Sequence, residues 1–244
     1  MLTLIYRGKS KTLYQHPTIP NALIMKFEDD VTAADGAIRM IAKGKGLLNA
    51  RISAYFFKLL ESNGIRTHMI SYDNSDTMVV KKLKMIPLEV VIRNYAYGSQ
   101  LKRMPLFKAL QPLKPPIIEY HYKSDELHDP LVLREDVIYA GVVTGRQLRL
   151  IEDLSLRINS IMANDMEKKG IKLIDLKLEF GFDENGEIVV GDEITGDSFR
   201  ALNEKGEHLD KEIFRKTRNV QLLIKRYIEL GKRLGVSIEG VEGY

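Results

Sequence analysis

The chain has 244 residues, of which 44% are hydrophobic and 29% are charged, a mixture typical of globular proteins with room for one large domain or two small ones. It contains no cysteine, which excludes disulfides and thiolate-bound metals and leaves oxygen or imidazole as the ligands for any metal. The net charge is +4 and the pI is about 9.0, but the basic residues are scattered rather than gathered into an arm. Because aromatic residues are few and tryptophan is absent, we expect no nucleic-acid partner and favour anionic small-molecule substrates.

No apolar run in the sequence is long enough to cross a bilayer, so we expect no membrane association. The first residues lack the apolar stretch and the small-residue cleavage site that are typical of a signal peptide. A cytoplasmic location is therefore the expected one. The sequence contains no repeat, no low-complexity tract and no long linker.

The first third of the chain is predicted to be rich in strands. Five runs of β-favouring residues bounded by turn residues predict strands at 2–8, 11–16, 22–27, 66–72 and 77–83. The acidic, small-residue segment 28–38 is expected to be a loop. A helix over residues 46–63 follows, because apolar side chains recur at helical spacing and Gly64 stands where a helix would end.

The rest of the chain mixes strands and helices. Pro87 is expected to interrupt the strand pattern, and the segment 104–116 is expected to be irregular because it is rich in proline and lysine. The later elements predicted are a helix over about 144–169, a β-hairpin over 171–193, and an amphipathic helix from about 210 to 234 closed by Gly235.

The order of these elements predicts the fold class. Strands dominate first and mixed elements follow, with few β-α-β alternations, which favours an α+β fold over a doubly wound sheet. A boundary near Pro87 would separate a β-rich N-terminal lobe (1–84) from a larger C-terminal lobe (85–244).

The segment YRGKSK (6–11) is a candidate phosphate-binding turn. A glycine lets backbone N–H groups approach phosphate oxygens, and Lys9 and Lys11 would supply positive charge. The segment is not a Walker A loop, because the first glycine of that pattern would fall on Thr3. An ordinary β-turn with solvated lysines is the alternative.

The predicted hairpin brings two carboxylates together. Strand alternation places three polar residues on one face: Asp175, Lys177 and Glu179. Asn185-Gly186 is a preferred two-residue turn, and counting back from it places Glu179 directly opposite Asp192. Such like charges repel unless a cation lies between them, and Mg²⁺ binds carboxylates together with phosphate oxygens. The alternative is a solvated outer face, where the repulsion costs roughly a few tenths of a kcal/mol.

The segment VIRNYAYGS is a candidate phosphate clamp. It places Arg93 at the end of a strand and Gly98-Ser99 in the turn that follows. A guanidinium group beside a hydroxyl and backbone amides suits a phosphate, although an exposed arginine near a turn is the commoner situation. The five histidines show no metal-binding spacing, and no Gly-x-Ser-x-Gly nucleophile motif occurs.

Six sequence blocks occur in a fixed order along the chain: YRGKSK, DGAIRMIAKGKGLLN, VVKKLKMIPLEVVIRNYAYGS, YKSDELHDPLV, LIDLKLEFG and GDEITGDSFR. VIRNYAYGS, DLKLEFG and GDE-x-x-x-D-S-x-R are highly specific in combination. Together the blocks resemble the phosphoribosylaminoimidazole-succinocarboxamide synthase (SAICAR synthetase) family over nearly the whole chain, from Tyr6 to the FRKTRN block. One departure is Ala34, where a glycine is common.

The resemblance implies an ATP- and Mg²⁺-dependent ligase of purine biosynthesis. Such an enzyme joins L-aspartate to the carboxylate of an aminoimidazole ribotide and releases ADP and phosphate. The resemblance also implies a homodimer and a two-lobed fold similar to ATP-grasp enzymes, with an N-terminal lobe reminiscent of protein kinases.

The family's site residues can be carried over by position. The lysines that resemble those around the ATP phosphates are Lys9, Lys11 and Lys81. The stretch similar to the hinge that reads adenine runs from Lys82 to Met85. The residues that match the Mg²⁺-associated carboxylates are Glu179 and Asp192, which with Lys177 are the expected catalytic set. The positions that match the ribotide-phosphate site are Arg93, Ser99 and Arg200. Other matches to polar positions of the substrate cleft are Lys123, Asp175, Lys177 and Arg215.

Two other functions compete with this interpretation. A small-molecule kinase would use ATP without needing aspartate, but the sequence has no HRD-like catalytic loop. A nucleic-acid binder without enzymatic activity would be supported only by the basic pI. Of these three interpretations, the combined motifs favour the ligase.

Overall fold

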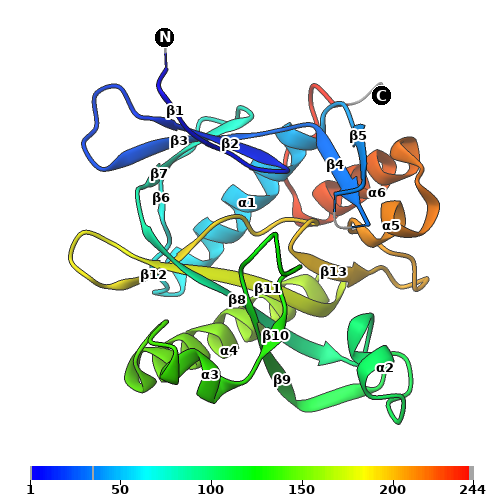
Figure 1. Cartoon of the computed structure of the whole chain (residues 1–244). Coiled ribbons are helices and arrows are strands. Elements are labelled where there is room, and N and C mark those ends of the chain that lie inside the picture. The colour runs from blue at the N-terminus through cyan, green and yellow to red at the C-terminus, as the bar shows by residue number, and fades with distance from the viewer. Residues whose placement is uncertain (1, 35, 242–244) are drawn as a thin grey trace.

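The computed structural model describes residues 2–34 and 36–241, and its main elements are two antiparallel sheets with helices packed around them (Figure 1). The first sheet has five strands in the order β1-β2-β3-β7-β6. These strands are β1 (Leu4–Arg7), β2 (Lys11–Gln15), β3 (Ala22–Phe27), β6 (Met69–Ser71) and β7 (Thr77–Lys81). All five lie within strands that the sequence predicts.

The second sheet has six strands and is built around two long ones. Its strands are β8 (Lys84–Tyr95), β9 (Pro112–Tyr122), β10 (Leu131–Val132), β11 (Lys172–Phe182), β12 (Ile188–Gly191) and β13 (Phe199–Leu202). β11 pairs with β8 along one edge, and with β13 and β12 along the other. β9 and β10 extend the sheet beyond β8.

Helix α4 (Gly145–Glu167) covers one face of the second sheet. It begins where the sequence predicts, because the Thr144 hydroxyl accepts a hydrogen bond from the Gln147 backbone N–H at 3.2 Å. Alternate residues of β11 are buried in the core that this helix shares with the sheet: Leu176, Leu178 and Phe180. The residues between them therefore project from the opposite face of the sheet.

The two sheets are joined through helix α1 and through strand β12. Helix α1 (Lys45–Ser62) packs against β3 and β7 of the first sheet and also contacts α4. The backbone of Val190 in β12 bonds to the segment before β6, with His68 N donating to Val190 O at 2.9 Å. One apolar core is continuous across both sheets. The fold is therefore α+β and two-lobed, as predicted, whereas the boundary between residues 84 and 85 stays a prediction.

The remaining helices are short or lie at the C-terminal side of the molecule (Figure 1). They are α2 (Ser99–Arg103), α3 (Arg134–Tyr139), α5 (Glu212–Thr217) and α6 (Val220–Leu234). In the described part of the chain, no helix is long and apolar enough to cross a membrane.

The acidic segment expected to be a loop is instead a small hairpin of β4 (Asp30–Ala33) and β5 (Ile38–Ile41). Its side chains explain the difference, because Val31 and Ala33 are buried in an apolar cluster with α6. The Arg39 guanidinium also pairs with the Asp30 carboxylate across the two strands at 2.6 Å. Ala34 adopts a left-handed φ of 50° in the connection.

Three boundaries differ from the sequence prediction. Pro87 lies inside β8, at a point where the pairing with β11 shifts register, and a bulge is a position where a strand tolerates the missing N–H of proline. Residues 112–116, expected to be irregular, belong to β9. The predicted C-terminal helix is split into α5 and α6 because Arg218 adopts a left-handed φ of 56°, after which the Asn219 side chain caps α6.

Candidate active site

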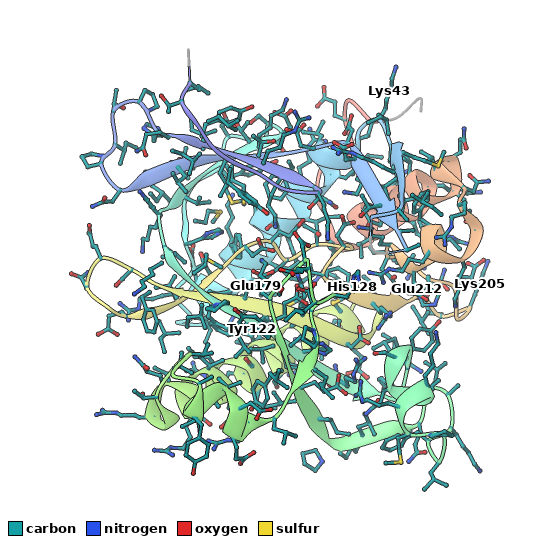
Figure 2. The ribbon with its side chains drawn as sticks, in the orientation of Figure 1. Lys43, Tyr122, His128, Glu179, Lys205 and Glu212 are labelled. Carbon is teal, nitrogen blue, oxygen red and sulfur yellow. The ribbon has the colours of Figure 1, made fainter. Side chains whose placement is uncertain are left out.

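The open face of the six-stranded sheet carries a row of charged side chains from its two central strands. Asp175 and Glu179 of β11 lie beside Arg93 and Glu89 of β8, because the pairing register matches Asp175 with Arg93 and Glu179 with Glu89. Lys177 lies between the two acidic residues and contacts Glu89 at 2.7 Å. Figure 2 shows Glu179 near the middle of the molecule. The sequence correctly predicts that these β11 side chains share one face.

A cavity of about 380 Å³ lies at the junction of the two sheets, and we call it the inter-sheet cavity. The five-stranded sheet contributes mostly apolar side chains to it, among them Leu13, Leu23 and Val80. The charged residues that line it are Lys11, Lys81, Lys123, Glu179 and Asp192. Met85 also lines this cavity, at the start of β8. The inter-sheet cavity therefore has both apolar and charged lining residues, which suits a ligand with an apolar part and a multiply charged part.

Asp192 is held in the cavity by the ammonium group of Lys11. Lys11 Nζ lies 2.5 Å from Asp192 Oδ1 and 3.0 Å from Glu193 Oε1. Burial alone would lower the pKa of Lys11, but these carboxylates outweigh burial and raise it. Burial would likewise raise the pKa of Asp192, and the lysines around it hold that pKa below its usual range. Both groups are therefore charged at neutral pH.

Glu179 is 2% exposed and accepts contacts from two lysines on the sheet face. Lys177 Nζ lies 2.9 Å from Glu179 Oε1, and Lys123 Nζ pairs with Glu179 Oε2. Burial would lower the pKa of Lys177, but Glu179, Glu89 and Asp192 overcome that effect and raise it well above its ordinary value. Lys177 is therefore a fixed positive charge rather than a proton acceptor.

The two carboxylates meet in this cavity by a different register from the predicted one. Glu179 pairs with Gly191, not with Asp192, because the hairpin loop has one residue more than a two-residue turn. The Asp183 carboxylate accepts the backbone N–H groups of Asn185 and Glu187, which closes the longer loop. Asp192 then adopts a left-handed φ of 58°, beyond the end of β12, and lines the cavity.

A second cavity, of about 170 Å³, lies over the other end of the same strands, and we call it the cationic cavity. Its basic residues are Arg93, Lys177, Arg200 and Arg215. Arg93 is buried, and its guanidinium donates to Asp175 at 3.1 Å, to Glu119 at 2.8 Å and to the Ser99 hydroxyl at 3.2 Å. The candidate clamp of the VIRNYAYGS motif is thus assembled around a buried arginine.

Arg200 and Arg215 complete the cationic cavity from β13 and α5. Arg200 Nη1 donates to Asp175 Oδ2 at 2.7 Å, and its Nε donates to Glu212 Oε2 at 3.2 Å. Arg215 contacts the same Glu212 oxygen at 3.1 Å. Figure 2 shows Glu212 on the side of the molecule formed by α5. Burial raises the pKa of Asp175 even though two arginines oppose that effect. The ionised form of this carboxylate is therefore disfavoured by its removal from water.

Three residues from the predicted set are not among those that line either cavity. Lys9 is largely exposed and pairs with Asp125 at 2.7 Å. The Lys82 side chain is exposed, and the backbone N–H of this residue donates to Asn21 O at 2.8 Å. Ser99 is exposed at the start of α2 and reaches the site through its contact with Arg93.

The sequence reasoning missed several residues of the site. His68 lines the inter-sheet cavity, is 5% exposed and packs edge-on against Phe57. In the described part of the chain its Nε2 atom has no hydrogen-bond partner. Burial lowers the pKa of His68 to about 4, so the ring is neutral at pH 7. No local motif signals this residue, because the segments that enclose it are distant in sequence.

Asp197 was also missed, although it stands inside the GDE-x-x-x-D-S-x-R motif. It lines the cationic cavity and pairs with the fully buried Lys45 at 2.8 Å and with Lys211 at 3.6 Å. The Tyr227 hydroxyl donates to it at 2.5 Å. Its place in the motif was the available signal for a site role. A further missed pair is Glu119, which accepts from Arg93, and His121, which lines the cationic cavity 3.6 Å from Glu119.

The donor chemistry of the inter-sheet cavity fits Mg²⁺. Glu179 and Asp192 offer carboxylate oxygens to one cavity, and Mg²⁺ favours one or two carboxylates together with phosphate oxygens and water. Among residues 2–34 and 36–241, no cluster of three or more acidic or histidine side chains could enclose a metal ion alone. A metal held here would therefore need further ligands from a bound phosphate or from water.

Comparisons with known proteins agree on one family. Residues 4–228 match the sequence profile described as SAICAR synthetase. A phosphoribosylaminoimidazole-succinocarboxamide synthase from Caldivirga maquilingensis is 46% identical over 238 residues, which cover 97% of each chain. The corresponding protein from Pyrobaculum aerophilum is 44% identical and covers 94% of this chain and 95% of its own.

Solved structures show the same likeness. The structure of a SAICAR synthetase (Type-2) in complex with ADP is 44% identical, with a TM-score of 0.88, and covers 94% of this chain and 96% of that chain. The synthase from Ehrlichia chaffeensis is 38% identical, with a TM-score of 0.90, and covers 96% of this chain and 99% of that one. Sequence motifs, fold and near-complete coverage thus agree, and the chain belongs to the SAICAR synthetase family.

Proposed function

We infer that this chain is an ADP-forming ligase that joins L-aspartate to 5-amino-1-(5-phosphoribosyl)imidazole-4-carboxylate in de novo purine (IMP) biosynthesis. The reaction yields the succinocarboxamide ribotide, ADP and phosphate. The observation that carries this inference is the pair of cavities on one strand. The inter-sheet cavity suits a nucleotide, the cationic cavity suits a sugar phosphate, and Lys177 contacts Glu179 where the two approach each other.

The chemistry requires activation of a carboxylate. An amine does not displace oxide from a carboxylate, so the γ-phosphoryl group of ATP is transferred to a carboxylate oxygen and ADP leaves. The aspartate amine then attacks the acyl carbon, and phosphate leaves as the amide bond forms. The protein's contribution is to position the reacting groups and to neutralise charge.

We propose that ATP occupies the inter-sheet cavity. The apolar side chains of the five-stranded sheet would hold the base. The backbone from Lys82 to Met85 would form hydrogen bonds with the edge of the base. Lys11 and Lys81 line the same cavity and would neutralise the phosphates. Lys9, which is not among the lining residues, would add positive charge from the turn before Lys11. Bound to Glu179 and Asp192, Mg²⁺ would supply Lewis-acid charge to the phosphate oxygens.

We propose that the ribotide occupies the cationic cavity. Its phosphate would be held by Arg93, Ser99 and Arg200, and its carboxylate would be directed along β11 toward Lys177. In that position the Lys177 ammonium group, whose charge Glu89 and Glu179 maintain, would stabilise the negative charge of the carboxylate during phosphoryl transfer. The remaining cations near the site, Lys123 and Arg215, would be available to the carboxylates of aspartate.

A coupled assay tests the proposed reaction. ADP, phosphate and amide product should form together, and only when ATP, Mg²⁺, the ribotide and aspartate are all present. Alanine lacks the side-chain carboxylate and would leave a cleft cation unpaired, so we expect it to be used at least about a hundredfold less efficiently. Equal ADP formation without an amine would instead indicate a small-molecule kinase.

We also propose a homodimeric, cytoplasmic enzyme in which residues 1–84 and 85–244 are the two lobes. Light scattering after size-exclusion chromatography would measure the mass of the particle. A mass of one chain, 27.9 kDa, at assay concentration would contradict the dimer without affecting the proposed reaction.

A further inference from the structure

Tyr97 lies where the candidate phosphate clamp meets helix α5, and no part of the proposed reaction uses it. It follows β8 and directly precedes Gly98 and Ser99. The Arg200 guanidinium carbon lies 5.4 Å from the centre of the Tyr97 ring, and Lys216 Nζ lies 5.3 Å from it. Both distances are within the range of cation–π attraction.

The Tyr97 hydroxyl belongs to a hydrogen-bonded chain whose polarity is fixed at both ends. Lys216 Nζ lies 2.5 Å from the hydroxyl and 3.2 Å from His208 Nε2, and an ammonium group can only donate. The hydroxyl lies 2.8 Å from His208 Nε2, and His208 Nδ1 lies 2.9 Å from Asp210 Oδ2. With a carboxylate as the final acceptor, His208 carries its proton on Nδ1 and the tyrosine hydroxyl donates to Nε2.

The far end of this chain returns to Arg200. Asp210 Oδ2 also accepts the backbone N–H of Ala201, the residue after Arg200, at 2.8 Å. Asp210 Oδ1 accepts the backbone N–H of Glu212 at 2.7 Å, and Glu212 in turn pairs with Arg200 Nε at 3.2 Å. His208 and Asp210 are both buried, so this frame is shielded from solvent competition.

The backbone of Gly98 also lies close to the Arg200 guanidinium group. A Cβ atom added to Gly98 would lie 3.0 Å from Arg200 Nη2, and Gly98 has a φ of 61°. Arg200 is thus bounded by the Tyr97 ring, by the Gly98 backbone and by the carboxylates of Asp175 and Glu212. A side chain as long as arginine has many rotamers, and fixing it in advance lowers the entropy cost of binding an anion.

We propose that Tyr97 is a positioning residue of the ribotide-phosphate site, whose aromatic ring holds the Arg200 guanidinium in the orientation that binds the phosphate. The hydroxyl, through Lys216 and His208, fixes the ring against α5. This inference rests on the proposed seating of the ribotide in the cationic cavity. It assigns a binding contribution to a residue that itself touches no substrate.

Three substitutions separate the ring from the hydroxyl. Tyr97→Leu removes both, whereas Tyr97→Phe keeps the ring over Arg200. Tyr95→Leu is the matched control, because Tyr95 is two residues earlier and has Lys172 Nζ 5.4 Å from its ring centre, but lines neither the inter-sheet cavity nor the cationic cavity. For each variant we would measure KM for the ribotide and for ATP, kcat, and the dissociation constant of ribose 5-phosphate.

Tyr97→Leu should raise the ribotide KM and the ribose 5-phosphate dissociation constant about tenfold, a cation–π-sized loss, with the ATP KM within about twofold. Tyr97→Phe should stay within about threefold of the wild type, and Tyr95→Leu should match the wild type. In the background of Arg200→Lys, Tyr97→Leu should add little, because both changes remove the same interaction.

The inference is overturned if Tyr97→Leu leaves ribotide affinity unchanged, raises both KM values alike, or is no worse than Tyr97→Phe. Full additivity with Arg200→Lys would overturn it too. These results are distinguishable from a failure of the proposed function. A wild type that binds ribose 5-phosphate in a Tyr97-dependent way, yet forms no amide with aspartate, would refute the ligase and leave the positioning role intact.

Discussion

The two cavities over β11 are built in different ways. In the inter-sheet cavity, apolar side chains from the five-stranded sheet form much of the wall, and the charged groups gather around Glu179 and Asp192. In the cationic cavity, Arg93, Arg200 and Arg215 are each already paired with a carboxylate of the protein. An apolar wall is ready for a base as it stands. A paired arginine must instead weaken its contact with the protein carboxylate when it binds a phosphate. Its affinity for the phosphate is therefore the difference between the arginine–phosphate and the arginine–carboxylate interactions.

The largest effect should come from the charged part of the inter-sheet cavity. Asp192→Asn keeps the shape of the side chain but removes a charge proposed to bind Mg²⁺, and kcat/KM at limiting Mg²⁺ should fall about a thousandfold. Titration of activity with Mg²⁺ would measure the change. Glu187→Gln, at the other end of the same hairpin and exposed, is the control and should behave as the wild type. Near-normal turnover of Asp192→Asn would contradict the proposal that Mg²⁺ binds at this site.

The next effect concerns the cationic cavity, where an arginine would exchange a protein carboxylate for the ribotide phosphate. Arg93→Lys keeps the charge but loses the fork that contacts Asp175, Glu119 and Ser99 together. The ribotide KM should rise roughly thirtyfold while the ATP KM changes little, because lysine cannot bind a phosphate through two parallel N–H groups. Arg66→Lys, at an exposed pair with Glu187, is the matched control. An altered ATP KM in Arg93→Lys would mean that the two cavities are wrongly assigned.

A smaller effect is expected at the apolar wall, from His68. His68 lines this cavity with a ring that is neutral at pH 7, and its buried Nε2 atom has no hydrogen-bond partner in the described part of the chain. With the ring proton on Nδ1, Nε2 would accept a hydrogen bond from the adenine amino group of ATP, a donor that phosphate oxygens cannot supply. We expect His68→Leu to reduce kcat/KM for ATP about tenfold and to leave inosine triphosphate nearly unchanged. His68→Gln, which retains an acceptor, should recover most of the activity with ATP. A constant ratio of ATP to inosine triphosphate across these variants would exclude this contact.

The last effect concerns stability instead of activity, and it again involves His68. Its pKa is about 4 in the folded protein, against 6.5 ordinarily, so unfolding takes up a proton between these values. The neutral ring therefore stabilises the fold fully above pH 6.5, and this contribution is lost as the pH falls toward 4. From pH 7.5 to pH 5 the wild type should lose about 2 kcal/mol more unfolding free energy than His68→Gln. Urea unfolding at both pH values measures it, and equal losses would show that the ring titrates normally.

The sequence predicted most of the fold where signals are local. Alternation along β11 placed Asp175, Lys177 and Glu179 on one face, and the structure confirms that arrangement. A helix was also predicted over about 144–169, and in the structure Thr144 caps the start of α4. These predictions hold because a strand's two-residue period and a helix's capping chemistry do not depend on distant residues.

The error in the hairpin register arose where one side chain changed the local geometry. The Asn185-Gly186 signal predicted a two-residue turn, but the Asp183 carboxylate closes a longer loop and shifts the register by one residue. A one-residue shift places side chains on the opposite face of a strand. Asp192 still reaches the cavity because it lies beyond β12 with a left-handed backbone. Both carboxylates thus line the inter-sheet cavity, whereas the predicted register between them was wrong.

The residues missed altogether are those whose packing partners are distant from them in the sequence. His68 acquires its burial from Phe57 in α1 and from Val190 in β12, and neither contact leaves a pattern near His68 in the sequence. Lys45 likewise is fully buried only because Asp197, far along the chain, provides its counter-charge. A buried charge of this kind cannot be told from a solvated one until the packing is known.

Strand β11 also fixes a length. Asp175, which contacts both arginines of the candidate phosphate clamp, and Glu179, beside the proposed metal, are four residues apart on one pleated strand. At about 3.3 Å per residue they are separated by about 13 Å. In the proposed arrangement, β11 therefore sets the distance between the ribotide phosphate and the ATP phosphate that is transferred. A ribotide analogue with its phosphate tether lengthened by one methylene would bind to the arginines, yet its carboxylate would miss the point of transfer.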